Sequence, residues 1–143
     1  MNIYTYATII DKLEQFATAH QMIKRFTHGQ IAQADLEKEG EWAWMHVVPN
    51  SITYSRGASV YSFDVFFADL PRVKDTKTDY QKFAISDCSQ LFADLVSQIA
   101  IDGFFGDQWV VQLPVTANPF IEEFTHVLSG VQGTINIEVP FDM

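Results

Sequence analysis

Four histidines and one cysteine are the residues of this sequence with the strongest capacity to hold a metal ion. None of His20, His28, His46 and His126 stands at a metal-ligand spacing with another histidine or with Cys88. The sequence contains neither a C-x-x-C nor an H-E-x-x-H motif, so we expect no metal site. A lone histidine beside an apolar strand, such as His46, is usually a hydrogen-bonded residue of the core or its rim.

Cys88 is also the one candidate for a thiol nucleophile. A nucleophilic thiol needs a positively charged, partly exposed setting and a nearby base. Cys88 instead lies among the apolar residues of a predicted helix, and its neighbours Asp87 and Ser89 bring no positive charge. Burial raises the pKa of a thiol. We therefore expect Cys88 to be inert and to pack as a small apolar side chain.

Pairs of acidic residues are the remaining candidates for general acid–base chemistry. Such chemistry requires an environment that separates the pKa values of the two carboxyl groups. The pairs Glu37/Glu39, Glu39/Glu41 and Glu122/Glu123 lie in polar stretches of the chain. This setting favours solvated surfaces over a catalytic pair.

Two glycine-containing segments, GFFG at 103–106 and GVQG at 130–133, have no phosphate-binding pattern. They lack both the lysine and the helix start that a phosphate loop needs. The sequence thus predicts no catalytic, cofactor-binding or metal-binding residue. We do not expect an enzyme, and we expect no cofactor.

Length and composition indicate a soluble domain. The chain has 143 residues, of which 48% are hydrophobic and 14% aromatic, enough for one domain over 1–143 with its own core. One cysteine allows no disulfide within the chain, which fits synthesis in a reducing cytoplasm. The first residues, MNIYTYATIIDKLEQ, lack the basic start of a signal peptide, and the apolar runs are too short to span a membrane.

The net charge of −9 bears on the partners of the protein. With 18 acidic and 9 basic residues, the chain lacks the basic surface of a sequence-reading nucleic-acid binder. An acidic wall still allows DNA to pass without sticking, because like charges repel. The alternative is that the charge only keeps the protein soluble.

Two segments have the apolar spacing of amphipathic helices. Residues 5–26 repeat apolar side chains at i, i+3, i+4 and i+7, with Thr5 in place to cap the start and Gly29 just past the end. Residues 79–101 carry a wider apolar stripe that ends at an Asp-Gly pair. We predict a long helix over each segment.

Strand patterns fill most of the remaining chain. WMHVVP at 44–49 predicts a short strand that a proline stops, and the alternating residues of 51–55 and 59–69 predict a hairpin around the turn Arg56-Gly57-Ala58. Further strands are predicted over 109–113 and 131–139, with a loop between them. GQIAQADL at 29–36 is compatible with one more short extended piece.

The order of these elements predicts the fold class. The predicted order is helix, three short strands, helix and two strands. This order is not the regular alternation of strands and helices that predicts an all-parallel sheet. We expect an α+β fold with a mixed or mainly antiparallel sheet of about 4–5 strands. The two long helices should pack on one face of this sheet.

Aromatic residues outside the predicted core row are candidates for contacts with other proteins. Trp42 and Trp44 share a side if their segment is extended, Phe66 interrupts the polar side of its strand, and the Phe104-Phe105 pair flanks a glycine loop. The alternative is that these rings close the ends of the core. The charged connector RVKDTKTD adds three basic interface candidates, Arg72, Lys74 and Lys77.

Several segments resemble a known family. The opening IIDKLEQFATAHQMIKRFTHGQI resembles a first helix that runs into a glycine, and EWAWMHVVP resembles a strand with an aromatic before a proline. YSFDVFFADLP, with the charged loop and DCSQLFADLVSQI after it, resembles a central strand-to-helix passage, and PFIEEFTHVLSGVQGTINIEVPF resembles a closing segment. The family is that of the tail terminator and other tail-completion (neck) proteins of long-tailed bacteriophages.

This resemblance implies a function. Tail terminators assemble as a ring, usually a hexamer, at the head-proximal end of the tail tube. The resemblance therefore implies a virion structural protein, made in the host bacterial cytoplasm. Its partners are copies of itself, the tail tube protein and a head–tail connector or stopper protein, while DNA passes through the lumen without specific binding. It implies no membrane partner and no catalytic residues.

Two other functions stay open on the sequence alone. One is a small cytosolic α+β domain that binds a ligand between helix and sheet, for which His46, Tyr54 and Asp64 are scattered candidates. The other is a monomeric adaptor that binds one partner through the region of Trp42 and Trp44. The oligomeric state separates both from a ring-forming subunit.

Overall fold

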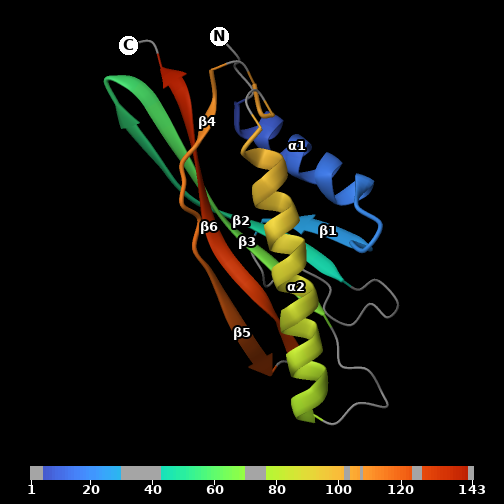
Figure 1. Cartoon of the computed structure of the whole chain (residues 1–143). Helices are drawn as coiled ribbons and strands as arrows, with labels where there is room; N and C mark the ends of the chain where they lie inside the picture. Colours follow the sequence, from blue (N-terminus) through green and yellow to red (C-terminus); the bar gives the residue numbers. More distant parts are fainter. Residues whose placement is uncertain are drawn as a thin grey trace.

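Two helices and a six-stranded mixed sheet form an α+β fold in the computed structural model (Figure 1). The structure describes residues 5–29, 43–69, 77–101, 104–106, 108–123 and 127–141. The predicted fold class is confirmed. In chain order the elements are α1 (Thr5–Ala19), β1 (Arg25–His28), β2 (Trp44–Ser55), β3 (Gly57–Asp69), α2 (Lys77–Ile99), β4 (Val110–Val111), β5 (Ala117–Glu123) and β6 (Val127–Phe141).

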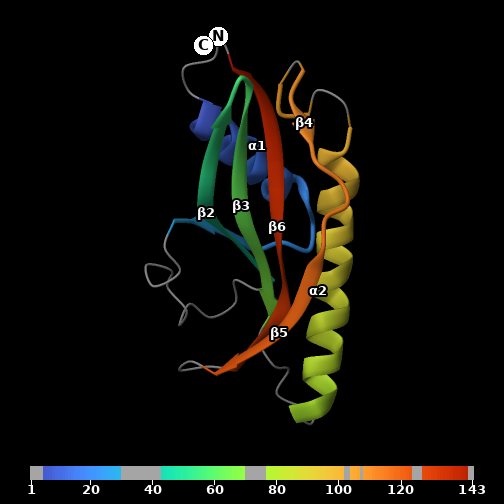
Figure 2. The same cartoon turned by 90° about the vertical axis from the view of Figure 1, so that its left-hand side faces the viewer.

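The sheet has the order β1-β2-β3-β6-β4, with β5 also paired to β6. Strand β1 is parallel to β2, and the other pairs are antiparallel. Strands β4 and β5 lie beside different parts of β6, at Ile137–Glu138 and at Val127–Gly133. They are two pieces of one broken outer strand (Figure 2). Counting both pieces is one reason why the sheet has more strands than the predicted 4–5.

One hydrophobic core lies between the helices and the sheet. Alternate residues of β3 and β6 point into it, and the register pairs Phe63 with Ile135 and Phe67 with Val131. Both helices contribute to the same cluster, as predicted. Their buried residues are Ile9, Ile10, Leu13 and Ala17 of α1 and Cys88, Leu91, Phe92, Leu95 and Ile99 of α2.

A hydrogen bond joins the end of α1 to α2. Nε2 of His20 lies 2.9 Å from Oδ2 of Asp94, and the N–H of Met22 donates to Nδ1 of His20 at 3.2 Å. Because Nδ1 accepts, Nε2 carries the proton of the neutral ring and donates to the carboxylate. Hydrogen bonds from His20 and Gln90 hold the pKa of Asp94 below its usual range.

Helix α1 ends at Ala19, so the prediction that it continues to residue 26 is wrong. Residues 25–28 instead form β1, which pairs with β2. Phe26 fits the helical spacing, but it packs against the same core from a strand. Hydrogen bonding to β2 therefore overrides the local helical pattern.

Strand β2 runs through Pro49, although we predicted that this proline would end the strand. The carbonyl of Val47 accepts from the N–H of Gly29 at 2.9 Å, on the side away from β3. Hydrogen-bonding groups alternate along a strand, so the nitrogen of Pro49 faces that same side. A missing N–H there breaks no bond with β3. A bulge between Pro49 and Ser51 follows, and the two predicted strands are one.

The segment predicted as a loop after residue 113 contains β5, which pairs with β6 over seven residues. Because proline is unfavourable inside most strands, Pro119 makes the sequence pattern of this segment unlike that of a strand. A sheet tolerates proline in an outer strand such as β5. Strand β6 is longer than the predicted 131–139, and β4 is shorter than the predicted 109–113. Helix α2 begins and ends two residues before the predicted 79–101.

Cys88 is fully buried in the core, as expected. The pKa of its thiol is raised to about 12, mainly by burial and in smaller part by the charges of Asp69 and Asp87. We expect native protein to react with the thiol reagent DTNB only as fast as the core opens. In denaturant, one thiol per chain should react at once, since the sequence has one cysteine. Rapid stoichiometric labelling of native protein would contradict this burial.

Candidate interaction surfaces

The face of the sheet opposite the helices, here called the outer face, carries a buried chain of hydrogen bonds. Nε1–H of Trp44 donates to Oγ1 of Thr27 at 2.7 Å, and this oxygen lies 2.6 Å from Nδ1 of His46. Nε2 of His46 lies 2.9 Å from the carbonyl of Gly29. A carbonyl only accepts, so Nε2 carries the proton and Nδ1 accepts the hydroxyl of Thr27. All these bonds are made when His46 is neutral.

Aromatic rings extend this cluster across the outer face. The guanidinium of Arg25 lies 5.2 Å from the centre of the Trp44 ring, and His46 lies between Trp44 and Phe66 at centroid distances of 5.2 and 6.4 Å. Phe66 meets Phe120 of β5 edge to face at 6.1 Å. The outer face is therefore buried at Arg25, Trp44 and His46, and half-buried at Phe66 and Phe120.

His46 makes the stability of the protein depend on pH. Burial lowers its pKa, the charges of His28 and Arg25 add to the lowering, and the hydrogen bond to Gly29 offsets part of it. Below the unfolded pKa of 6.5, the unfolded chain therefore takes up a proton that the folded chain does not. The free energy of unfolding should fall by up to about 1.4 kcal/mol per pH unit in this window.

Urea denaturation between about pH 7.5 and pH 5.5 measures this slope. His46→Gln should be less stable at the upper pH, because the acceptor for Thr27 is lost. It should also show a smaller slope. Equal slopes in the two proteins would contradict the role of His46.

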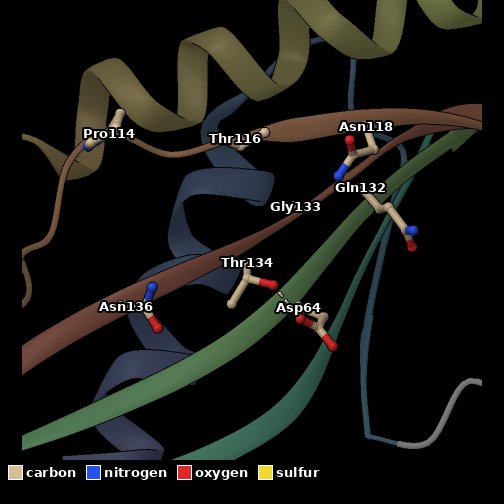
Figure 3. A pocket seen from close by; sticks show the side chains of 8 residues that line it. All are labelled: Asp64, Pro114, Thr116, Asn118, Gln132, Gly133, Thr134 and Asn136. Atoms are coloured by element: carbon tan, nitrogen blue, oxygen red, sulfur yellow. Dashed lines mark hydrogen bonds between the residues drawn. The ribbon is translucent and has the colours of Figure 1, made fainter.

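A polar pocket of about 440 Å³ opens on the outer face beside the break between β4 and β5. Oγ1 of Thr134 donates to Oδ1 of Asp64 at 2.7 Å, and Nδ2 of Asn50 donates to the same carboxylate at 3.2 and 3.3 Å. Asn118 and Gln132 lie side by side on β5 and β6 (Figure 3). The lining residues are Asp64, Pro114, Thr116, Asn118, Gln132, Gly133, Thr134 and Asn136.

The far end of the β2–β3 hairpin exposes apolar side chains. We call residues 49–60 the distal hairpin. Ile52 is 42% exposed and Tyr54 is 61% exposed. Together with Tyr6 of α1, which is 38% exposed, they line a shallow apolar groove that reaches Tyr61 and Phe63. Water-exposed apolar side chains gathered in one place indicate a contact surface.

The distal hairpin also presents a backbone edge. Strand β1 covers β2 only over Trp44–Val47, so within the described part of the chain no strand pairs with the outer side of Asn50–Thr53. Pro49 and the bulge stand at the start of this segment, and its four residues are exposed and uncharged. Edges are usually blocked by charges, prolines, bulges or covering elements. This edge has Pro49 and the bulge at its start and carries no charge along Asn50–Thr53.

The predicted interface residues differ in how deeply the structure buries them. Trp44 is 1% exposed and Phe105 is 3% exposed, so the prediction that they are surface aromatics is wrong. Phe104 contacts Phe105 edge to face and packs on the core, which supports the alternative that these rings close the core. Phe66 is half-buried on the outer face.

The other candidates lie mostly beyond the described residues. Trp42, Arg72 and Lys74 fall outside them, and of Lys77 only its place as the first residue of α2 is described. His46, Tyr54 and Asp64 do not share a cleft, because Tyr54 lies in the distal hairpin on the helix side of the sheet. The sequence pattern does not indicate the apolar side chains of the distal hairpin as a contact surface, since the alternation of SITYS is equally typical of a core strand.

Comparison with protein-family models and with curated proteins found no match to this sequence. No helix in the described part of the chain is both long and apolar enough to cross a membrane. Function therefore has to be inferred from the surfaces of the chain.

Proposed function

We propose that this chain is a structural subunit of a phage tail or neck, of the tail terminator kind. It assembles with copies of itself into a ring that joins the tail tube to the head connector. The observation that carries the proposal is the distal hairpin, which combines exposed apolar side chains with an uncharged backbone edge. The ring, its hexameric size and its place in the virion come from the family resemblance.

The two lateral edges of the sheet differ, and this favours a ring over a simple dimer. The edge at Asn50–Thr53 is uncharged, whereas the opposite edge at β5 ends in two acidic residues, Glu122 and Glu123. When a patch binds a different patch on the next copy, the contact is head-to-tail, and such contacts form a ring when the rotation between copies closes. The distal hairpin is suited to such a contact because it extends past α1 and α2 (Figure 1).

The charge of the chain fits the same role. A subunit that surrounds DNA without binding it needs to repel phosphate, and the net charge of −9 supplies that repulsion. The structural role calls for assembly and needs no turnover.

Light scattering over a wide range of concentration tests the proposal. We expect a mass several times the 16.3 kDa of one chain, and we expect Ile52→Asp to weaken assembly by tenfold or more, about the effect of 1.4 kcal/mol. Met22→Asp is the matched control, because Met22 is 59% exposed and lies outside the distal hairpin. Loss of assembly in both variants, or in neither, would contradict the role of the distal hairpin.

The polar pocket favours a second candidate, a ligand-binding α+β domain that acts as a monomer. Its lining residues converge from β3, β5 and β6 on one concave site. A protein that stays monomeric at all concentrations would favour this candidate over the ring.

A further inference from the structure

We propose that the polar pocket on the outer face binds a neutral saccharide. The inference goes beyond the proposed assembly and does not depend on it. The pocket lies where the outer strand is broken between β4 and β5, so the chain at Pro114 and Thr116 forms one wall and β3 and β6 form the floor. Its volume of about 440 Å³ is in the range of small-molecule sites, roughly 300–1,000 Å³.

Part of the pocket is held in place before any ligand arrives. Thr134 and Asn50 donate to the carboxylate of Asp64, and the hydroxyl of Ser62 donates to Oδ1 of Asn136. Each of these side chains therefore has a fixed orientation. Asp64 keeps acceptor capacity on its carboxylate, and Asn136 keeps both N–H groups of its amide, because its oxygen is the atom already bonded.

The rest of the pocket is ready to bond. The side-chain amides of Asn118 and Gln132 make no hydrogen bond with the described part of the protein. The two residues are neighbours in register on β5 and β6, and their amides point in different directions (Figure 3). Each amide offers two donors and one acceptor. The site thus presents several donors and acceptors to one ligand, which is what a sugar with many hydroxyl groups requires.

Charge excludes the main alternatives. Among the described residues that line the pocket there is no lysine, arginine or histidine, so these residues offer phosphate or another anion no counter-charge. Asp64 is the one charged residue in the described part of the lining, and its carboxylate already accepts two hydrogen-bond donors. The described residues hold no group of three acidic, histidine or cysteine side chains that suits a metal ion. A neutral ligand with many hydroxyls fits best.

An aromatic platform adjoins the amides. Phe66 is two residues from Asp64 on β3, Phe120 is two residues from Asn118 on β5, and Gln132 lies between the two strands in register. Both rings are half-exposed and meet edge to face. Rings placed beside polar groups offer an apolar surface to the C–H face of a pyranose while the amides bond its hydroxyls.

Saturation-transfer NMR with the purified protein tests this site. The probes are the methyl glycosides of glucose, galactose, mannose and N-acetylglucosamine, together with maltose, lactose and chitobiose. We expect transfer to the ring protons of at least one probe. Asn118→Ala and Gln132→Ala should each raise the Kd of that probe about tenfold, the effect of losing one or two hydrogen bonds.

Controls keep the test decisive. Neither substituted side chain is hydrogen-bonded to the described part of the protein, so both variants should unfold at nearly the wild-type temperature. Gln98→Ala removes an exposed amide from α2 and should leave the Kd unchanged. The proposal is overturned if no probe shows transfer, or if the Asn118 and Gln132 variants show the same transfer as the wild-type protein. It is also overturned if calcium chloride or inorganic phosphate shifts the pocket resonances and the sugars do not.

Discussion

Gly130→Ala is expected to lower the free energy of unfolding by about 4 kcal/mol or more, enough to unfold many domains of this size. A Cβ atom at this position would overlap the carbonyl oxygen of Phe67 and lie 2.9 Å from Cα of Ala68. These are backbone atoms of β3, which is paired with β6 at Ala68 and Gly130. They can move aside only if the two central strands separate. Glycine is therefore required here by the close approach of two backbones.

Gly57→Ala is the matched control for this prediction. Gly57 has a φ of +85°, but nothing lies within 4 Å of the added Cβ. The cost should be that of the left-handed backbone alone, about 1–2 kcal/mol. Urea denaturation of both variants gives the comparison. A loss in Gly130→Ala no larger than that in Gly57→Ala would show that β3 and β6 do not approach so closely.

Phe67→Ala has the second large expected effect, a loss of about 3–5 kcal/mol. Phe67 has no exposed surface, and its ring meets Phe92 of α2 edge to face at 5.8 Å. Removing it leaves a cavity between the sheet and α2 that neither backbone can fill. The measurement is the midpoint and slope of urea unfolding.

Phe83→Ala is the matched control, because it makes the same substitution at an exposed position. Phe83 lies on α2, is 42% exposed, and has the ammonium group of Lys82 4.9 Å from its ring centre. Phe83→Ala should therefore cost about 1 kcal/mol or less. Similar losses in Phe67→Ala and Phe83→Ala would contradict the position of Phe67 in the core.

Long regular patterns made the main elements predictable from the sequence. The stripe of α2 and the alternation of Phe63, Val65 and Phe67 each repeat many times, and the core uses those same side chains. The fold class followed because the order of the elements excludes an all-parallel sheet. The burial of Cys88 followed from its place in the same stripe.

Features that depend on partners distant in the sequence could not be predicted. Residues 25–28 became a strand because β2 lies beside them, and β5 formed around a proline because it is an outer strand. The polar pocket combines residues from three strands. Trp44 is buried, and its indole N–H donates to Thr27, seventeen residues away, a contact that no local pattern indicates.

Electron microscopy of the purified protein in negative stain shows directly whether the chain assembles into rings. We expect class averages of closed rings with a central hole, and we expect Ile52→Asp to yield few rings while Met22→Asp yields as many as wild type. The resemblance implies six subunits in each ring. A field of single 16.3 kDa chains at every concentration, or rings unaffected by Ile52→Asp, would contradict assembly through the distal hairpin.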